Sequence, residues 1–353
     1  MNACKADSIH RFLLAKFNVD YILQFSMVTE VKQALSDLSS SEEENEQRMD
    51  QTYDRIIRLI REKPQRIRKY VFRALSWIGY ATRTLTIQEL LVAISVEANQ
   101  YHLGDSGLIR SDDLLDYCNG LVTYEGQAVR LVHFSVRNYL DRHQAIPEDA
   151  KEAYHAITCS TYLSFDILKE YHCENSFKSL TDLRRSFPFL DYAGNNLAFH
   201  LSKVEHRHYT ETTSAVMKQL ESQGHRRVYC AINSDIGGPH DIPRLNLACA
   251  IGYEEAVRSL LEEGEVDINA KGPSDGLTSL SWAVVMGHEA VVKRLFREGK
   301  LDWSCNGTAL LLMAIREGRT GVVRLLIEKG VEVNFACDYV GQSSYSGMQH
   351  YRR

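Results

Sequence analysis

Length, composition and charge set the first limits on this protein. The chain has 353 residues and a formal net charge of −5, with 44% hydrophobic and 25% charged residues. These values are typical of a soluble globular protein of two or three domains, and the charge gives no sign of a polyanionic partner. Only six prolines are present, which suits a mainly helical chain.

Neither a membrane span nor a secretory signal is predicted. No apolar run approaches the ~20 residues that cross a bilayer. The first ten residues, Met1–His10, carry charges where a secretory signal has an apolar centre. We therefore expect an intracellular protein without a membrane partner, in the cytoplasm or, as an alternative, in the nucleus.

The eight cysteines are widely spaced, and no two of them show the C-x2-C spacing of a zinc site. Cys118, Cys159 and Cys249 lie within apolar helical patterns, so we expect small core residues in a reducing compartment. No metal or other cofactor is predicted.

The first predicted segment, 1–46, resembles the end of a larger domain. Phe12–Phe17 and Val28–Leu35 have apolar residues at helical spacing but no partner surface within the segment. The acidic run Ser39–Glu46 follows, and its composition favours a solvated linker.

Segment 47–143 begins with helical patterns. A pattern from Tyr53 to Ile60 stops at Pro64, and Ile67–Tyr80 follows. Thr86 and Glu89 have the spacing of a capping box, in which each side chain bonds the other's backbone N–H. Further helices are expected at Leu90–Val96 and at Asp112–Gly120, the latter capped by Ser111.

The hydrophobic period then changes to two. Strands are predicted at Leu121–Tyr124 and Val129–Phe134, followed by a helix at Ser135–Leu140. His133 falls in the second strand, where a structural histidine is favoured over a catalytic base. Helices followed by a two-stranded hairpin form the order of a winged helix.

Segment 144–236 has irregular helical patterns and is predicted to be a connector. The turn-rich joint Gly237–Pro243 separates it from segment 241–353. In that last segment one unit recurs: Ala248, Ala283 and Ala314 follow one another at intervals of 35 and 31 residues. An internal period near 33 indicates a solenoid.

Each copy has a short helix with the small alanine, a glycine that ends it, a second helix with paired apolar residues, and a second glycine. Glycine adopts the left-handed conformation of a helix end at little cost. One unit cannot bury its apolar face alone, so neighbouring copies must stack. The glycines are Gly252, Gly264, Gly287, Gly299, Gly318 and Gly330.

These copies resemble ankyrin repeats. Gly276–Ala283 lies where that family has Gly-x-Thr-Pro-Leu-His-x-Ala, with serines at 279 and 281, and Gly307–Ala314 is a looser copy. Gly341–Tyr345 is similar to the opening of a truncated fourth repeat. The fold class implied is mainly α: a winged helix with a small β-hairpin, an irregular helical connector and an ankyrin α-solenoid.

A second resemblance covers most of the chain from Phe12 onward. Leu75–Leu90, Cys118–Val122 and Val132–Leu140 are similar to the winged-helix segment that follows the NACHT domain in fungal NACHT–ankyrin proteins. That winged-helix family takes its name from a GPI inositol-deacylase. The chain has no Gly-x-Ser-x-Gly nucleophile elbow, so no deacylase is implied.

The chain differs from this architecture in lacking the sequence motif of the nucleotide-binding site. No Gly-x4-Gly-Lys-Ser/Thr loop is present, so no cradle of backbone N–H groups is expected for phosphates. The chain resembles the C-terminal portion without the P-loop NTPase core, as either a truncated gene product or a shortened paralogue. An NTPase domain in the same or another chain is then an expected partner.

Nucleic-acid binding through the winged helix is the alternative function. The helix before the hairpin carries Asp112, Asp113 and Asp116 and no basic residue, which argues against insertion into a groove. A basic cluster lies on earlier helices, where a solvated or domain-contacting face is favoured. Its members are Arg55, Arg58, Arg61, Lys63, Arg66, Arg68, Lys69 and Arg73.

No enzyme is predicted. No Ser/His/Asp or Cys/His arrangement follows from the spacing, and the pairs His206/His208 and His155/Cys159 lack a second pair of metal ligands. The expected function is a non-enzymatic protein-interaction module that resembles the regulatory and sensor part of a NACHT–ankyrin signalling protein.

Trp282 is predicted to be a core residue. Partner contacts are predicted instead in the turns between repeats, where an exposed tryptophan is a candidate hot spot. The candidate protein-binding residues are Asp275, Trp303, Asn306 and Tyr339. The last repeat should leave its apolar side open for lack of a polar cap, so Leu310–Asn334 should exchange amide hydrogens before Leu280–Phe296.

Overall fold

The chain divides into two compact units. One comprises residues 1–94 and 108–151, and the other comprises residues 95–107 and 152–353. The computed structural model describes 15–17, 19, 27, 29–32, 45–103, 108–147, 152–170, 180–233, 236, 241–272, 276–301 and 307–331. The predicted helices at Phe12–Phe17 and Val28–Leu35 are described only in part, and most of the acidic run and the predicted fourth repeat lie outside the described residues. The prediction that the linker extends to Glu46 is wrong, because Asn45 and Glu46 already belong to the first helix of the domain that follows.

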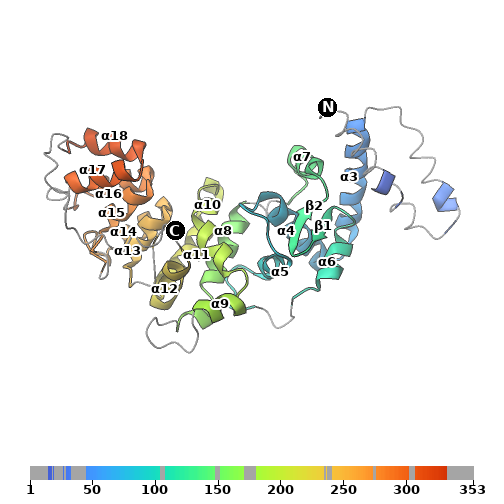
Figure 1. The fold of residues 1–353 in the computed structure, drawn as a ribbon, viewed down its shortest axis with the longest axis horizontal. Helices are drawn as coiled ribbons and strands as arrows, with labels where there is room; N and C mark the ends of the chain where they lie inside the picture. Colours follow the sequence, from blue (N-terminus) through green and yellow to red (C-terminus); the bar gives the residue numbers. More distant parts are fainter. Residues whose placement is uncertain are drawn as a thin grey trace. The chain divides into compact units, whose positions relative to one another are not determined.

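The first unit is a small helical domain with a two-stranded sheet (Figure 1). Its buried centre includes Tyr53, Leu75, Trp77 and Leu90. Pro64 separates the first two helices as expected, since proline cannot continue a helix. The elements are α3 (Asn45–Glu62), α4 (Gln65–Tyr80), α5 (Ile87–Ser95), α6 (Ser111–Tyr117), β1 (Val122–Glu125), β2 (Ala128–Leu131) and α7 (Phe134–Arg142).

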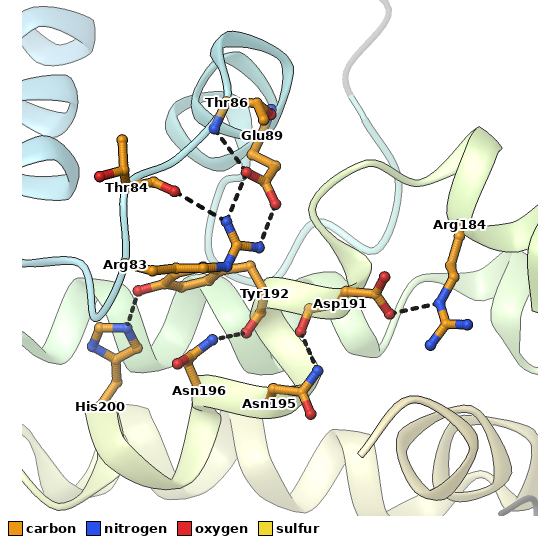
Figure 2. Close-up of polar contacts among 10 residues, drawn as sticks. All are labelled: Arg83, Thr84, Thr86, Glu89, Arg184, Asp191, Tyr192, Asn195, Asn196 and His200. Carbon is orange, nitrogen blue, oxygen red and sulfur yellow. Dashed lines mark hydrogen bonds and ion pairs between the residues drawn. The ribbon is translucent and has the colours of Figure 1, made fainter. Parts of the chain in front are cut away.

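The predicted capping box is present at the start of α5. The backbone N–H of Thr86 donates to Glu89 Oε2 at 2.8 Å, and the N–H of Glu89 donates to Thr86 Oγ1 at 3.2 Å. Arg83 also donates to Glu89, through Nη1 to Oε2 at 3.0 Å and Nη2 to Oε1 at 2.5 Å (Figure 2). Although burial opposes the charge, these hydrogen bonds hold the pKa of Glu89 below its usual value.

The hairpin is shorter than the sequence predicts. β1 and β2 pair antiparallel from Val122 opposite Leu131 to Glu125 opposite Ala128, and Thr86 forms an isolated bridge with Ala128. The prediction that His133 lies in the strand is wrong. β2 ends at Leu131, and the Val132 N–H makes one further bond to the Leu121 carbonyl at 2.9 Å. His133 lies beyond this bond and instead caps α7 by accepting from the Ser135 N–H at 3.3 Å.

A second correction concerns α6. Ser111 is not its N-cap but its first helical residue, and the cap position belongs to Arg110, whose side chain bonds no backbone N–H there. Arg110 instead forms an ion pair with Asp113, with 2.7 Å between Nη2 and Oδ1. A carboxylate in the first turn is favoured by the helix dipole, which explains why α6 begins here without a serine cap.

The second unit starts with a helical cluster around α8 (Figure 1). α8 is buried along almost its whole length, polar His155, Thr158 and Ser160 included. α10 and α11 pack against it. The elements are α8 (Glu152–Leu163), η2 (Asp166–Leu168), α9 (Leu180–Ser186), α10 (Leu190–Leu201), η3 (His206–His208), α11 (Tyr209–Glu221) and α12 (Gln223–Ile232).

α10 presents one polar and one buried side (Figure 2). On the buried side the Tyr192 hydroxyl lies 3.0 Å from His200 Nε2. On the other side Asn195 Nδ2 donates to the Asp191 carbonyl, and the Asp191 carboxylate lies 2.8 Å from Arg184 Nε of α9. His200 also lies edge-on to His155 of α8, with 5.1 Å between the ring centroids, so aromatic contact is part of the packing of α10 on α8.

Three helical hairpins follow in the same unit (Figure 1). The small residue of each first helix, Ala248, Ala283 or Ala314, has no exposed surface, as its predicted role in close packing requires. All six predicted helix-ending glycines have positive φ. The hairpins are α13 (Arg244–Ile251) with α14 (Glu254–Glu263), α15 (Ser279–Met286) with α16 (Glu289–Arg297), and α17 (Gly307–Arg316) with α18 (Thr320–Glu328).

The first hairpin also packs against the connector, because α11 contacts both α13 and α14. Two arginines of α12 fix this joint. Arg226 donates to the Leu220 and Glu221 carbonyls at the end of α11 and to the Ile242 carbonyl at 3.0 Å. Arg227 forms an ion pair with Asp241. The connector therefore covers the start of the repeat array.

Candidate protein-interaction surface

The repeats are held together at the glycine that ends each first helix. His288 Nε2 lies 3.0 Å from the Ala250 carbonyl of the preceding repeat, and Arg319 Nε donates to the Val285 carbonyl at 2.9 Å. His288 and Arg319 each follow a helix-ending glycine, as does Tyr253, whose hydroxyl accepts from Thr213 of α11 at 3.3 Å. One position per copy therefore joins each repeat to the element before it.

The same contacts require glycine. A methyl group at Gly252 would overlap the His288 ring, and one at Gly287 would lie 2.6 Å from Arg319 Cδ. At Gly318 nothing lies within 4 Å of such a methyl group. The third glycine is therefore open because no described repeat follows it.

The second helices carry the charged surface of the array. Arg258 of α14 pairs with Glu255 at 2.5 Å and with Glu262 at 3.2 Å, and Arg294 of α16 reaches Glu254 of α14 at 3.4 Å. These side chains are partly exposed, so each pair contributes only about 0–1 kcal/mol. Their charges remain accessible to a partner.

The first helices form the apolar interior. Trp282 is 1% exposed, which confirms it as a core residue. Asn246, which is also fully buried, donates to the Leu277 carbonyl at 3.0 Å and accepts from Ser279 Oγ of the next repeat at 2.7 Å. Buried polar groups of this kind are paired across the stack and fix its register.

The four candidate residues predicted from sequence are not placed by the structure. Asp275, Trp303, Asn306 and Tyr339 all lie outside the described residues. Their role in binding a partner stays a prediction.

The end of the array exposes three apolar side chains on its described part. Leu312 and Ile315 of α17 are 39% and 54% exposed, and Ile327 of α18 is 43% exposed. We call these three residues the terminal face. Leu312 and Ile315 are three residues apart on α17, so their side chains lie on the same side of that helix.

The helix before the hairpin, α6, has no basic residue that could contact a nucleic-acid groove. α6 carries Asp112, Asp113 and Asp116 and no lysine or arginine. Arg110 forms hydrogen bonds that hold the pKa of Asp113 below its usual value, so the carboxylate stays charged. A duplex would meet like charge here.

The basic cluster on α3 and α4 divides into two groups. Arg73 is buried and donates to the Ile94 carbonyl at 2.9 Å, which corrects its assignment to a surface cluster. Arg58, Arg61 and Arg66 are exposed. In the part of the chain that the structure describes, five members form no ion pair with a carboxylate: Arg58, Arg61, Lys63, Arg66 and Arg68.

Two neighbouring residues of α8, His155 and Cys159, are core residues. His155 and Cys159 are both fully buried, and burial lowers the pKa of His155 and raises that of the Cys159 thiol. His206 lies beside Tyr209, with 4.9 Å between ring centroids. No group of three or more His, Cys, Asp or Glu suited to a metal ion occurs among the described residues.

Comparison with known families agrees with this architecture. Residues 60–157 match the family described as GPI inositol-deacylase, winged helix domain. Residues 245–337 match three copies of the family described as ankyrin repeats. The chain carries a winged-helix domain followed by ankyrin repeats. No curated protein matches the chain.

The repeats indicate a protein-interaction module, and neither matched segment is a catalytic domain. No helix in the described ranges combines the length and apolar character needed to cross a bilayer. The residues that sequence reasoning missed are the links between repeats, His288 and Arg319. The sequence did contain a signal. In every copy a long polar or aromatic residue directly follows the glycine that ends the first helix, namely Tyr253, His288 and Arg319.

Proposed function

We propose that this chain is a non-enzymatic interaction protein whose ankyrin array binds another protein. The observation that carries the proposal is the stack of three hairpins, in which each repeat is tied to the one before it and the charged second helices stay accessible. Stacked repeats of this kind present an extended surface that suits a protein partner.

We further propose that the array and winged helix act as the sensor and regulatory part of a NACHT–ankyrin signalling system. The support is the order of the two matched families along one chain. A P-loop NTPase domain, in the same or another polypeptide, is then a partner. The proposed divisions are 1–46 for the end of a NACHT domain and linker, 47–143 for the winged helix, 144–236 for the connector and 241–353 for the repeats.

An intracellular location, in the cytoplasm or the nucleus, is part of this proposal. It rests on the ankyrin match and on the buried thiols of Cys118, Cys159 and Cys249, which form no disulfide among the described residues and suit a reducing compartment.

Affinity capture with the full chain tests the interaction. Trp303→Ala should abolish capture of the specific partner without changing the melting temperature, because the proposal places this tryptophan at the contact. Arg137→Ala, an exposed substitution in α7 of the first unit, is the matched control and should leave capture unchanged. A partner bound equally by wild type and Trp303→Ala would contradict the assigned contact, and no partner for any form would contradict the function.

Nucleic-acid binding remains the alternative because five cations of α3 and α4 form no ion pair among the described residues. An electrophoretic mobility assay at physiological salt separates the two functions. We expect no shift. A tight shift weakened by charge reversal at Arg58, Arg61 and Arg66 would support the alternative instead.

A further inference from the structure

The junction between α3 and α4 carries positive charge that no carboxylate of the described residues neutralises. The stretch from Arg55 to Lys69 contains a single carboxylate, that of Glu62. The cations of this stretch that form no ion pair with any described residue are Arg58, Arg61, Lys63, Arg66 and Arg68. We call these five residues the junction cations. Such an excess of one charge on a surface attracts a partner of the opposite charge.

The junction cations lie close together. Arg58 and Arg61 are three residues apart in α3, so they lie on the same side of that helix. Arg68 Nη1, from α4, donates to the Arg61 carbonyl at 3.0 Å and so brings the start of α4 against the end of α3. Arg58, Arg61 and Arg66 are exposed, and their charges are therefore accessible to a partner.

Two of the junction cations are positioned by aromatic rings. Arg66 lies over the Tyr70 ring, 5.7 Å from its centroid, and Lys63 lies over the Tyr117 ring at 5.6 Å. The face of a ring attracts a cation but does not cancel its charge. Side chains that are already positioned lose less conformational freedom when a partner binds. This surface is therefore preorganised for anionic groups.

An acidic helix borders the same surface. The contact between Lys63 and Tyr117 places the junction cations next to α6, and α4 also packs against α6. α6 exposes the carboxylates of Asp112 and Asp116. A nucleic-acid duplex carries a charge about every 1.7 Å along its axis, so a duplex on the cations would also bring phosphates toward these carboxylates. A short acidic peptide can contact the cations without reaching α6, and this pattern of charge favours it.

The acidic run of this chain joins α3 at the opposite end. Residues 39–44 precede Asn45, the first residue of α3, and Arg58 lies ~20 Å further along the helix at a rise of ~1.5 Å per residue. The run would have to turn back along most of α3 to reach the junction cations. The geometry therefore favours a segment of another protein.

We propose that the junction cations bind an acidic segment of a partner protein, in which several Asp or Glu side chains lie close together in sequence. All of the cations except Lys63 are arginines, whose guanidinium groups offer paired N–H donors that fit a carboxylate. This surface belongs to the first unit, whereas the repeats belong to the second. The partner proposed for the repeats and the acidic segment proposed here rest on different residues, and neither proposal depends on the other.

Fluorescence anisotropy tests this proposal with the full chain and a labelled peptide of about eight glutamates, in about 100 mM salt. The wild type should bind the peptide saturably. Reversing the charge of the three exposed junction cations should weaken binding at least about tenfold, because attraction becomes repulsion. That variant is Arg58→Glu/Arg61→Glu/Arg66→Glu.

The matched control reverses three exposed cations of the repeat array, Lys293→Glu/Arg297→Glu/Arg324→Glu, and should bind the peptide as wild type does. Replacing the three junction arginines by glutamine keeps the test valid if the reversed variant fails to fold. It should weaken binding at least about fivefold, since three attractive charges are lost. No binding by wild type, binding that both junction variants leave unchanged, or equal weakening by the control would overturn the proposal.

Two further measurements distinguish other occupants of this surface. An unlabelled DNA duplex of about twelve base pairs should displace the peptide only at higher concentration than unlabelled peptide does, and displacement at lower concentration would replace the acidic segment with nucleic acid. Neutralising the acidic run of this chain, by Glu42→Gln/Glu43→Gln/Glu44→Gln, should leave the peptide affinity unchanged. A gain of about tenfold or more would show that this run itself binds the junction cations, and would overturn the proposal.

Discussion

The second and third repeats of the array share one sequence plan but differ in what covers them. Val284 of the second repeat is fully buried beneath the third, whereas its counterpart Ile315 is 54% exposed. A methyl group at Gly287 would lie 2.6 Å from Arg319 Cδ, whereas at Gly318 no atom of the described residues lies within 4 Å of such a group. The comparison shows that burial in a solenoid belongs to the interface between repeats, and the same helical hairpin has a different energy at the end of the stack.

The largest expected effect comes from introducing a charge at these matched positions. Val284→Glu buries a carboxylate without a counter-ion and should destabilise the second unit by about 3–5 kcal/mol. Ile315→Glu should change stability by no more than about 0.5 kcal/mol, because the side chain stays in water. Urea unfolding of the full chain measures both values. Equal losses for the two variants would mean that both positions are covered.

The glycines give a second contrast. Gly318→Ala should cost about 1–2 kcal/mol, the strain of a side chain in the left-handed region. Gly287→Ala should cost more, because its methyl group would also lie 2.6 Å from Arg319 Cδ and disturb the link to the Val285 carbonyl. The difference between the two melting temperatures isolates the contact with the next repeat. A larger loss for Gly318→Ala would contradict this packing.

A third prediction concerns the pH dependence of folding stability in the second unit, which contains four histidines with lowered pKa values. Burial lowers the pKa of His155, His225 and His288 and lowers that of His200 to about 4. The unfolded chain binds these protons near pH 6.5, so stability is complete above that value and falls as the pH drops toward the folded pKa. His200 alone should cost on the order of 1 kcal/mol between pH 7.5 and pH 5.5.

His200→Gln tests the assignment. The variant should lose less stability than wild type over that pH interval, even if it is less stable at pH 7.5. Urea unfolding of the second unit, followed by circular dichroism at the two pH values, gives the slopes. An unchanged slope would show that His200 is not the group that titrates.

How much was predictable from sequence also differs between the regions. The repeat hairpins, their helix-ending glycines and buried alanines were predicted correctly, because the period of the array repeats the signal. The capping box at Thr86 was predicted because its spacing is local. His133 was missed because the end of β2 depends on where its partner strand begins, which no local pattern records.

The links between repeats were harder to predict from one sequence. His288 and Arg319 reach carbonyls in the preceding repeat, and their partners become visible only once the copies are stacked. The packing of α11 on the first repeat had no signal, since the connector does not share the period of the array. The four predicted binding residues remain predictions, because they lie outside the described residues.

Amide hydrogen exchange across the array tests the central claim most directly, namely that each repeat is protected by the next. The full wild-type chain is the form to measure. The account predicts that Leu310–Glu328 exchanges before Leu280–Phe296, because the second repeat packs between the first and the third, whereas in the described part of the chain the third packs only on the second. Equal protection of the two segments, or the reverse order, would contradict it.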